Sequence, residues 1–489
     1  MDTPTARASA DKAADQRSSD QRSWRALGVL LTAGFMTLLD TSIVNVALPS
    51  IERGLGAAEA ELSWVVSGYA LSFGLVLVPA GRLGDLYGRR EVFLGGLALF
   101  TLASVACGLA PGATWLVVFR LLQGAAAGMV SPQVSGLIQQ MFQGPLRARA
   151  FGRLGSVVGI STAVGPLAGG LLIGGFGAEH GWRAVFFVNL PIGVAAFAAA
   201  LRLLPRTERA GRGRTGFDLV GVVLLGTGVV AIMLPLVQEQ QWAGRGKWLL
   251  IPAGVALLAG FWGWERRASR QSARGRAPLV DLRLFGLRSF SLGALLGLAY
   301  FSGFTTLFFV YTLFLQNGHG LSALQAGLAA TPVAVGSAGA AAAGGRLVVR
   351  HGRRLVAYGL VGVALGLAGT MAVVQFVPGR AVALVAAVPL LLAGVGSGLV
   401  ISPNTTLTLS KVPVSLGGSA SGVLQTGQRI GSAAGIAMVS AVFFAHVANH
   451  DDWGRALQLG LLTALAFVLL ALAVAVADVR GERREAPPD

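Results

Sequence analysis

Three charged residues interrupt long apolar stretches of the 489-residue chain: Asp40, Arg120 and Arg429. A charged side chain in the hydrocarbon core of a membrane is costly, so each is a candidate functional residue. Asp40 lies about 14 residues, or roughly 21 Å of helix, from the start of its stretch. Arg120 lies about 6 residues, or roughly 9 Å, from the start of a stretch that runs in the opposite direction. Both fall in the same half of a hydrocarbon core of about 30 Å, and they can pair if their helices are neighbours.

This pair predicts proton chemistry, with Asp40 as the protonatable group and Arg120 as the group that tunes it. Burial favours the protonated carboxyl and a nearby guanidinium favours the ionised one, so a changing distance between them would bind and release a proton. The alternative is a fixed ion pair that holds two helices together. Arg429 lies about 12 residues into its stretch, near the middle of the membrane. It either contacts an anionic or polar substrate or bonds to a neighbouring helix.

The segment GRLGDLYGRR joins two apolar stretches and combines turn-forming glycines with both signs of charge. Gly81 and Gly88 permit a tight turn and close helix approach. Asp85 can accept hydrogen bonds from a neighbouring helix N-terminus or from arginines such as Arg89, which precedes Arg90. We interpret the segment as a latch that breaks during a conformational cycle. The alternative is a turn that carries cytoplasmic positive charge.

This decapeptide recurs as GRLVVRHGRR at 345–354, identical at six of ten positions. A second pair of similar segments is LLQGAAAGMV at 121–130 and LLAGVGSGLV at 391–400. The separations between the two copies, about 264 residues for the first pair and 270 for the second, agree closely. A parallel repeat of six-helix halves is typical of one large class of transporters. Val349 replaces Asp85 in the second copy, so a latch there is expected to lack its acidic member.

One apolar stretch, GSVVGISTAVGPLAGGLLIGGF, is rich in small residues. Gly165, Gly169 and Gly170 offer a face for close helix packing, and Pro166 would kink the helix and free a carbonyl. Packing alone explains such a face, but its place on the fifth helix of a repeat-built chain favours a functional role.

Two kinds of side chain are candidates for substrate binding. The aromatic stretch AYFSGFTTLFFVYTLFLQ suits an apolar, drug-sized pocket, although lipid contact or core packing explains it nearly as well. Polar side chains inside helices are stronger candidates because lipid would leave their amides without hydrogen bonds, while some simply bond across helices. The full set is Asn45, Gln123, Phe304, Phe308, Asn404, Gln425 and Arg429.

The elements that must carry these residues are membrane helices. Hydrophobic residues make up 54% of the chain and charged residues only 12%, whereas soluble domains carry roughly 25% charged residues. The net charge of +17 falls in short loops rather than on a soluble face, which argues against nucleic-acid binding. No P-loop, catalytic triad or metal motif is convincing, so we expect no enzyme activity, no metal and no cofactor.

Apolar stretches long enough to span a membrane recur along the whole chain. They number about fourteen, at 26–48, 62–80, 92–110, 114–137, 154–176, 184–204, 217–237, 247–264, 290–315, 322–344, 355–377, 381–402, 417–445 and 457–477. With the N-terminus inside, about 31 of the 39 Lys and Arg residues fall in tails and cytoplasmic loops, which predicts cytoplasmic termini.

We therefore expect an all-α polytopic membrane protein built from two bundles. The expected parts are a disordered cytoplasmic tail (1–25), an N-terminal six-helix bundle (26–204), basic loops with two inserted transmembrane helices (205–289), a C-terminal six-helix bundle (290–477) and a cytoplasmic tail (478–489). The inserted helices have no role that the sequence indicates.

Five ordered motifs resemble the major facilitator superfamily, specifically its fourteen-helix drug:proton antiporter family, over about residues 26–477. GRLGDLYGRR is similar to the superfamily's loop signature. LLDTSIVNVALPSI resembles the first-helix motif, with its acidic residue at Asp40, and RLLQGAAAGMV resembles the fourth-helix motif, with its proton-coupling arginine at Arg120. GPLAGG is similar to the antiporter motif of the fifth helix, and WRAVFFVNLPIG to the junction of helices five and six.

The resemblance implies the major facilitator fold and proton-coupled efflux of lipophilic drugs or antibiotics across the bacterial inner membrane by alternating access. It implies a monomer whose partners are a lipophilic small molecule, protons and the lipid bilayer, with the proton gradient in place of a cofactor. The alternatives are a dedicated exporter of one endogenous metabolite or lipid, and a membrane sensor or scaffold without transport. The predicted C-terminal helices lack carboxylates. A neutral, zwitterionic or anionic lipophile is therefore as well supported as a cationic substrate, and Arg429 is a candidate contact for it.

Overall fold

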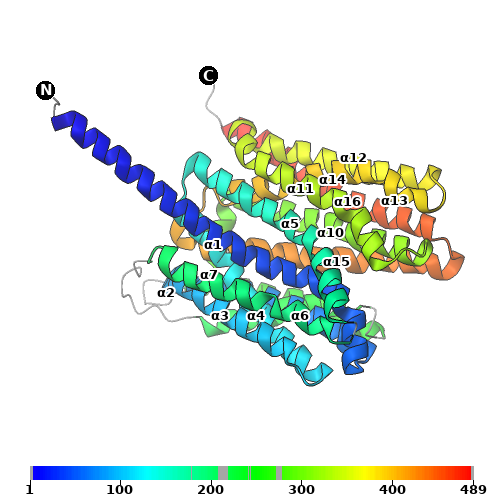
Figure 1. Ribbon diagram of the computed structural model, residues 1–489. Coiled ribbons are helices and arrows are strands. Elements are labelled where there is room, and N and C mark those ends of the chain that lie inside the picture. The colour runs from blue at the N-terminus through cyan, green and yellow to red at the C-terminus, as the bar shows by residue number, and fades with distance from the viewer. Residues whose placement is uncertain are drawn as a thin grey trace.

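The computed structural model describes residues 4–177, 179–206, 218–239, 242, 244–270 and 278–485. Within these ranges the regular secondary structure is helical, and 14 helices are long and apolar enough to cross a membrane (Figure 1). A helix satisfies all its backbone hydrogen bonds internally, which lipid requires. The predicted all-α fold with about fourteen spans is therefore confirmed.

The N-terminal bundle is formed by α1 (Pro4–Leu55), α2 (Glu59–Tyr87), α3 (Arg89–Gly108), α4 (Ala113–Met141), α5 (Gly144–Phe176), α6 (Gly181–Phe187) and α7 (Asn189–Leu203). The last two make one span with a break at Val188. Within the bundle α1 packs against α5 and α7, and α4 packs against α2 and α3.

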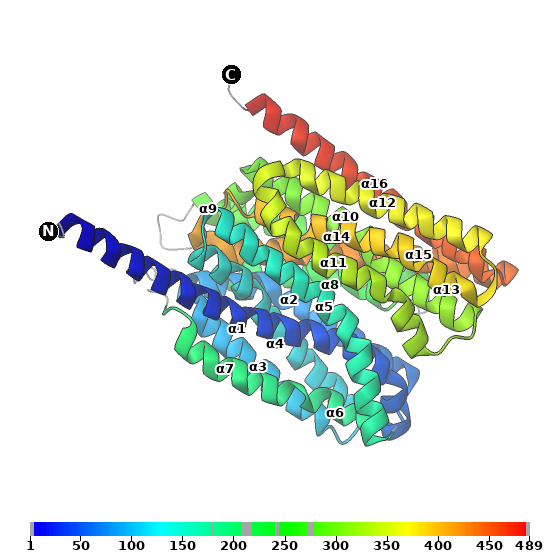
Figure 2. The same ribbon diagram turned by 45° about the horizontal axis from the view of Figure 1, so that its top comes forward.

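The C-terminal bundle is formed by α10 (Arg288–Leu313) with its extension η4 (Phe314–Gly318), α11 (Ala323–His351), α12 (Arg353–Phe376), α13 (Val382–Val385), α14 (Ala387–Thr408), α15 (Gly417–His450) and α16 (Trp453–Glu485). Here α14 packs against α11 and α12, and α10 packs against α15 and α16. Figure 2 shows the blue-to-cyan helices of the first bundle beside the yellow-to-red helices of the second.

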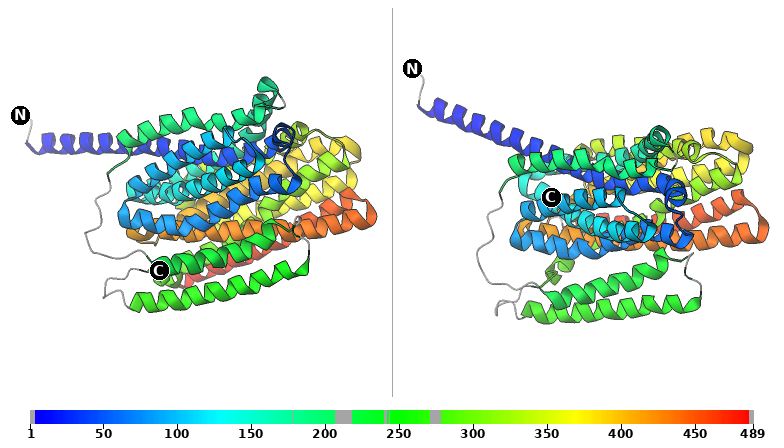
Figure 3. Two further views of the ribbon diagram at one scale, coloured as in Figure 1. Left: turned by 90° about the horizontal axis from the view of Figure 1, so that it is seen from below. Right: turned by 60° about the horizontal axis from the view of Figure 1, so that its bottom comes forward.

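A helical hairpin connects the two bundles. It consists of α8 (Leu219–Val237), the short η1 (Arg245–Leu249) and α9 (Leu250–Arg270), and η3 (Leu282–Gly286) leads from it to α10. Its first helix contacts α2 of one bundle and α15 of the other. The hairpin (green in Figure 3) therefore lies across the seam between the bundles.

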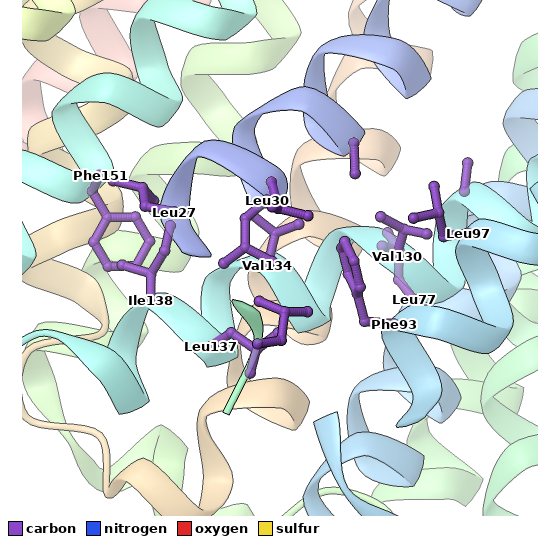
Figure 4. Close-up of a cluster of buried hydrophobic side chains, with 14 of the residues drawn as sticks. Leu27, Leu30, Leu77, Phe93, Leu97, Val130, Val134, Leu137, Ile138 and Phe151 are labelled. Atoms are coloured by element: carbon purple, nitrogen blue, oxygen red, sulfur yellow. The ribbon is translucent and has the colours of Figure 1, made fainter. Parts of the chain in front are cut away.

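The N-terminal core is a close packing of large apolar side chains. Leu27 and Leu30 of α1 lie against Val134 and Ile138 of α4, with Phe151 of α5 beside them (Figure 4). All five are at most 3% exposed. Lipid tails are as apolar as these side chains, so complementary packing rather than exclusion of water stabilises the contacts.

The bundles meet along two lines of small residues. On one line α5 lies against α11, and a Cβ atom on Gly159 would come within 2.8 Å of the Ala334 carbonyl oxygen. On the other line α2 lies against α15, and a Cβ atom on Gly81 would overlap the backbone of Gly418. The absence of a side chain is what permits these backbones to approach.

Both chain ends are more helical than the sequence predicts. A disordered tail is predicted over 1–25, whereas α1 begins at Pro4 and projects from the bundle (Figure 1); residues 1–3 lie outside the described ranges. Ala, Arg, Lys and Gln are good helix formers, and extension of an anchored helix avoids the cost of nucleation. For the same reason α16 continues to Glu485 through most of the predicted C-terminal tail.

Candidate functional site

A buried ion pair joins α1 to α4. The Oδ2 atom of Asp40 lies 2.5 Å from Nη1 of Arg120, and the two side chains are 0% and 1% exposed. Because the two helices run in opposite directions, a residue deep in α1 lies level with one near the start of α4. The structure thus brings the two predicted residues together.

Further hydrogen bonds surround this pair. Oδ1 of Asp40 accepts from the amides of Gln123, at 2.8 Å, and Asn189, at 2.9 Å. Arg120 donates to the Gln123 side-chain oxygen at 2.8 Å and to the Val65 carbonyl oxygen at 3.0 Å. All five residues are buried, so protein groups replace water around both charges.

Asn189 is a site residue to which the sequence assigns no role. It is the first residue of α7, at the break in the sixth span. Its amide donates to Ser104 Oγ at 3.0 Å as well as to Asp40, and Ser104 donates to the Phe186 carbonyl oxygen at 2.9 Å. An asparagine within the apolar motif WRAVFFVNLPIG is the signal that points to it.

Two aromatic rings of α2 lie between the ion pair and Arg429. The guanidinium carbon of Arg120 is 4.2 Å from the centroid of the Tyr69 ring. That of Arg429 is 4.4 Å from the centroid of the Phe73 ring, and the two rings stack with centroids 6.2 Å apart. The Tyr69 hydroxyl donates to the Thr37 carbonyl oxygen at 3.3 Å. Because cations favour ring faces, this stack connects a charge in one bundle with a charge in the other.

A cavity of about 320 Å³ lies between the bundles. Its walls come from α1, α2, α4 and α5 on one side and α10, α14 and α15 on the other. Its polar lining consists of Thr37, Thr41, Ser131, Ser135, Thr162, Thr305, Ser402, Thr405, Ser421, Gln425, Gln428, Arg429 and Ser432. Arg429 is the single charged residue among the described residues that line it.

A side-chain contact bridges the bundles at the cavity wall. The Ser131 hydroxyl of α4 donates to the side-chain oxygen of Gln425. The Gln425 amide in turn donates to Ser421 Oγ at 2.9 Å. This contact must break if the cavity is to open between α4 and α15.

Asp85 binds the first turn of α15. Its carboxylate accepts from the backbone nitrogens of Gly418, at 3.0 Å, and Ser419, at 2.8 Å, and from the Ser419 hydroxyl at 2.8 Å. It also lies 2.7 Å from Arg89, which donates to the Val414 carbonyl oxygen. A carboxylate at a helix N-terminus satisfies free N–H groups and interacts favourably with the helix dipole.

The other residues of the predicted latch shape the turn and brace one bundle. Gly88 has a φ of 112°, which favours glycine, and separates α2 from α3. Arg90 donates to the Leu201 carbonyl oxygen of α7 at 2.7 Å. Arg90 therefore acts within the N-terminal bundle, whereas Asp85 and Arg89 act at the seam.

In the second copy of the loop, an arginine pairs with an acidic residue of another helix. Arg353, which corresponds to Arg89, lies 2.9 Å from Asp478 of α16, and Arg288 lies 3.9 Å from the same side chain. The sequence predicts that a latch here lacks the acidic member, because Val349 replaces Asp85; the acid that Arg353 contacts comes instead from α16 of the same bundle. The partner lies more than a hundred residues away in sequence, so no local pattern reveals it.

The antiporter-like residues of α5 face different neighbours. Gly165 and Gly169 lie against α1, and a Cβ atom on Gly169 would come within 3.1 Å of an α1 side chain. Pro166 faces α11, while a Cβ atom on Gly170 would meet open space. The motif therefore contacts both bundles.

The predicted polar substrate residues separate into four environments. Gln425 and Arg429 line the cavity, whereas Gln123 belongs to the ion-pair network. Asn404 is buried and donates to a carbonyl oxygen of α10 at 3.0 Å. Asn45 is exposed outside the cavity lining.

The predicted aromatic substrate residues of α10 lie outside the lining of the cavity. Phe304 and Phe308 belong to the C-terminal core, where Phe304 stacks on Tyr300 with centroids 5.3 Å apart. The residues of α10 that line the cavity are Phe301 and Thr305. Because this helix is apolar on every face, its sequence does not show which face is turned toward the cavity.

Glu265 is a buried carboxylate at the end of α9. The predicted span 247–264 stops one residue before it, but the helix continues and Glu265 is 0% exposed. One of its oxygens accepts from the Leu279 backbone nitrogen at 3.2 Å. The other oxygen has no hydrogen-bond partner among the described residues.

Asp281 caps η3, outside the membrane spans. Its carboxylate accepts from the Arg283 backbone nitrogen at 3.0 Å and lies 2.9 Å from the Arg283 guanidinium. Burial raises the pKa of Asp281, but these hydrogen bonds outweigh burial and the pKa is lowered overall. The side chain is therefore ionised at neutral pH where it secures the entry to α10.

Comparison with known proteins gives sequence relatives over most of the chain. The profile described as the Major Facilitator Superfamily matches residues 30–436. The chain is 38% identical over 439 residues to the "Probable actinorhodin transporter" of Streptomyces coelicolor, covering 86% of this chain and 73% of that protein. It is 33% identical over 439 residues to the "Tetracenomycin C resistance and export protein" of Streptomyces glaucescens, covering 89% and 79%. It is 35% identical over 416 residues to the "Multidrug resistance protein Stp" of Mycobacterium tuberculosis, covering 84% and 74%.

Solved structures share the fold at low sequence identity. The human organic anion transporter MFSD10 aligns with a TM-score of 0.68 and 16% identity, covering 93% of this chain and 99% of that chain. The proton:xylose symporter XylE aligns with a TM-score of 0.66 and 15% identity, covering 92% and 95%. At these identities the likeness concerns the fold alone.

Proposed function

The chain belongs to the major facilitator superfamily, as its motifs predict, and from this premise we propose that it exports lipophilic small molecules in exchange for protons. It is a multi-pass transporter of the plasma membrane and not an enzyme. Relatives named for antibiotic export and multidrug resistance support the outward direction of transport.

The observation that carries the proposal is a buried ion pair beside a cavity that both bundles line. Asp40 lies one helical turn from Thr37 and next to Thr41, which line the cavity. When Asp40 is protonated it loses its charge and its charge-assisted bond to Arg120 weakens. Arg120 then remains buried without its counter-ion, which favours rearrangement of the helices around it.

We infer that α2 transmits this rearrangement to the latch. The helix carries Tyr69, against which Arg120 lies, and also Asp85, which binds the start of α15. A shift of α2 changes both contacts together. The bias of Lys and Arg predicts that the latch lies on the cytoplasmic side. With that orientation, the intact latch would close the cavity toward the cytoplasm.

The proposed cycle couples proton entry to substrate exit. A proton from outside neutralises Asp40 and favours release of substrate to the outside, and loss of the proton to the cytoplasm prepares the cavity for another substrate. Each proton that enters across a potential of about 100 mV supplies roughly 2.3 kcal/mol, to which the pH gradient adds. No cofactor takes part, and a single chain is sufficient.

Proton movement in proteoliposomes tests the proposal. Wild type and Asp40→Asn are compared with an internal pH dye, an imposed pH gradient, and cationic, neutral and anionic lipophiles. We expect substrate-driven proton movement in wild type and its loss in Asp40→Asn, because asparagine cannot carry the proton.

The matched control is Asp451→Asn. Asp451 is exposed and has a φ of 49°, which asparagine tolerates, so proton movement should be unchanged. Full proton-coupled export by Asp40→Asn would contradict the proposal.

The alternative is a dedicated exporter of one compound. It is favoured by relatives whose names each specify a single compound. Saturable transport of only one member of the lipophile panel supports this alternative, and transport of several chemically unrelated members supports multidrug export.

A further inference from the structure

We propose that Arg429 is the recognition point for an anionic group, a carboxylate or an ionised phenol, on an aromatic substrate. The inference rests on the proposed function in one respect, that the cavity between the bundles holds the substrate. It adds the chemical class of the substrate and the residue that selects it.

Arg429 differs from the other arginine beside the cavity in its partners. Arg120 lies 2.5 Å from a carboxylate oxygen of Asp40. Among the described residues no Asp or Glu lies within ion-pair distance of Arg429, and its guanidinium lies over the Phe73 ring. A guanidinium carries five N–H donors in a planar fork, and a ring face satisfies them poorly. The donors of Arg429 therefore suit a planar anionic group of a ligand, which a guanidinium binds with two parallel hydrogen bonds.

Arg429 gives the cavity lining a net positive charge. No acidic residue is found among the described residues that line it. Charges interact more strongly in a protein interior than in water, so an anion gains an ion pair where a cation is repelled. An arginine near the middle of a membrane is costly unless it is paired, and a bound anion would supply the missing partner.

The rest of the lining indicates an aromatic and oxygen-rich substrate. Phe73 and Phe301 contribute rings from the two bundles, and rings favour offset or edge contacts with other rings. Thr37 and Thr305 contribute hydroxyl groups and Gln428 an amide, which can bond to carbonyl and hydroxyl groups of a ligand. An apolar pocket with a few polar groups that fix orientation is the usual form of a small-molecule site.

An anionic substrate also determines how the membrane potential acts. Export of a monoanion in exchange for one proton moves two elementary charges in the same electrical sense. Export of a neutral molecule moves one charge, and export of a monocation moves none. The potential therefore drives anion export most strongly.

Three probes that share a ring system and differ in charge test the inference. They are anthracene-carboxylate, its carboxamide and its aminomethyl analogue, and their binding to detergent-solubilised protein at neutral pH is followed by anthracene fluorescence. We expect wild type to bind the carboxylate at least about tenfold more tightly than the carboxamide, because a charge-assisted bond is lost in the amide. The aminomethyl cation should bind most weakly.

Variants identify the residue responsible. Arg429→Gln should abolish the preference for the carboxylate, and Arg429→Lys should retain part of it because the charge remains. The matched control is Arg266→Gln, which removes an exposed arginine that lies 5.6 Å from the centroid of the Trp262 ring and should keep the whole preference.

Each outcome separates this inference from the function on which it rests. Equal binding of carboxylate and carboxamide by wild type, or an undiminished preference in Arg429→Gln, overturns the inference alone. Failure of wild type to bind any of the three probes contradicts the lipophile cavity and the inference together. If Arg429→Gln does not fold, as judged by size-exclusion chromatography, the wild-type comparison and Arg429→Lys decide.

Discussion

At the residue scale, three donors from two helices converge on the carboxylate of Asp40. Arg120 balances its charge, while Gln123 and Asn189 add neutral hydrogen bonds to the other oxygen. A buried ion pair contributes little net stability, but the loss of one of its partners is costly. The neutral donors therefore allow the site to be perturbed without removal of a charge.

Replacement of Asn189 by alanine tests this network. The change removes one donor to Asp40 and one to Ser104, which should reduce stability by about 1–3 kcal/mol. Thermal unfolding of the purified protein in detergent measures the effect. Asn45→Ala, at an exposed position of α1, should leave the midpoint unchanged. Equal midpoints for the two variants would show that the Asn189 hydrogen bonds do not contribute to stability.

At the scale of elements, the inserted hairpin has a position that its sequence does not indicate. Near one end of α8, the Gln238 amide donates to Ser67 Oγ of α2 at 2.7 Å. Near the other end of the hairpin, Glu265 accepts from Leu279 in the segment that leads to α10. The hairpin is therefore attached to both a helix of the first bundle and the entry to the second.

The contact between α5 and α11 depends on glycine at specific positions. Gly159→Ala would place a Cβ atom 2.8 Å from the backbone of α11, and we expect a loss of about 1–3 kcal/mol from overpacking. Gly174→Ala, on the same helix, meets no atom within 4 Å and should be neutral or slightly stabilising, because alanine favours helix by about 1 kcal/mol. Thermal unfolding in detergent compares the two. A Gly159→Ala protein as stable as Gly174→Ala would contradict the close packing.

At the scale of the whole molecule, the latch connects the two bundles through a charged side chain of α2, Asp85, which binds the N-terminus of α15. Asp85 satisfies two backbone N–H groups at the start of α15, beside the contact between α2 and α15. Movement of one bundle against the other must break the Asp85 contact, whereas the Arg353–Asp478 pair remains inside its own bundle.

Neutralisation of Asp85 should shift the conformational equilibrium. Asp85→Asn removes the charge that favours the N-terminus of α15, and we expect the population open at the latch to rise about tenfold. Cys107, the one cysteine of the chain, is first replaced by alanine so that it takes up no label. Spin labels on Tyr87→Cys and Lys411→Cys, both at exposed positions, then report the distance across the latch. Asp20→Asn, at an exposed position on α1, is the control. An unchanged distance distribution in Asp85→Asn would rule out a role for the charge.

The sequence by itself determined the membrane spans, the internal repeat and the positions of Asp40, Arg120, Asp85 and Arg429. These are local properties: a span must satisfy its own backbone in lipid, and a charge inside an apolar stretch is visible without knowledge of any neighbour. For this reason about fourteen spans are predicted and 14 are found.

Only the tertiary structure decided which side chains meet. It added Asn189 to the ion pair, paired Arg353 with Asp478, and turned Phe301 rather than Phe304 toward the cavity. A membrane helix is apolar where it faces lipid and where it faces the core, so its pattern does not show its rotation. Partners on distant helices depend on that rotation and on packing, which are properties of the assembled bundle.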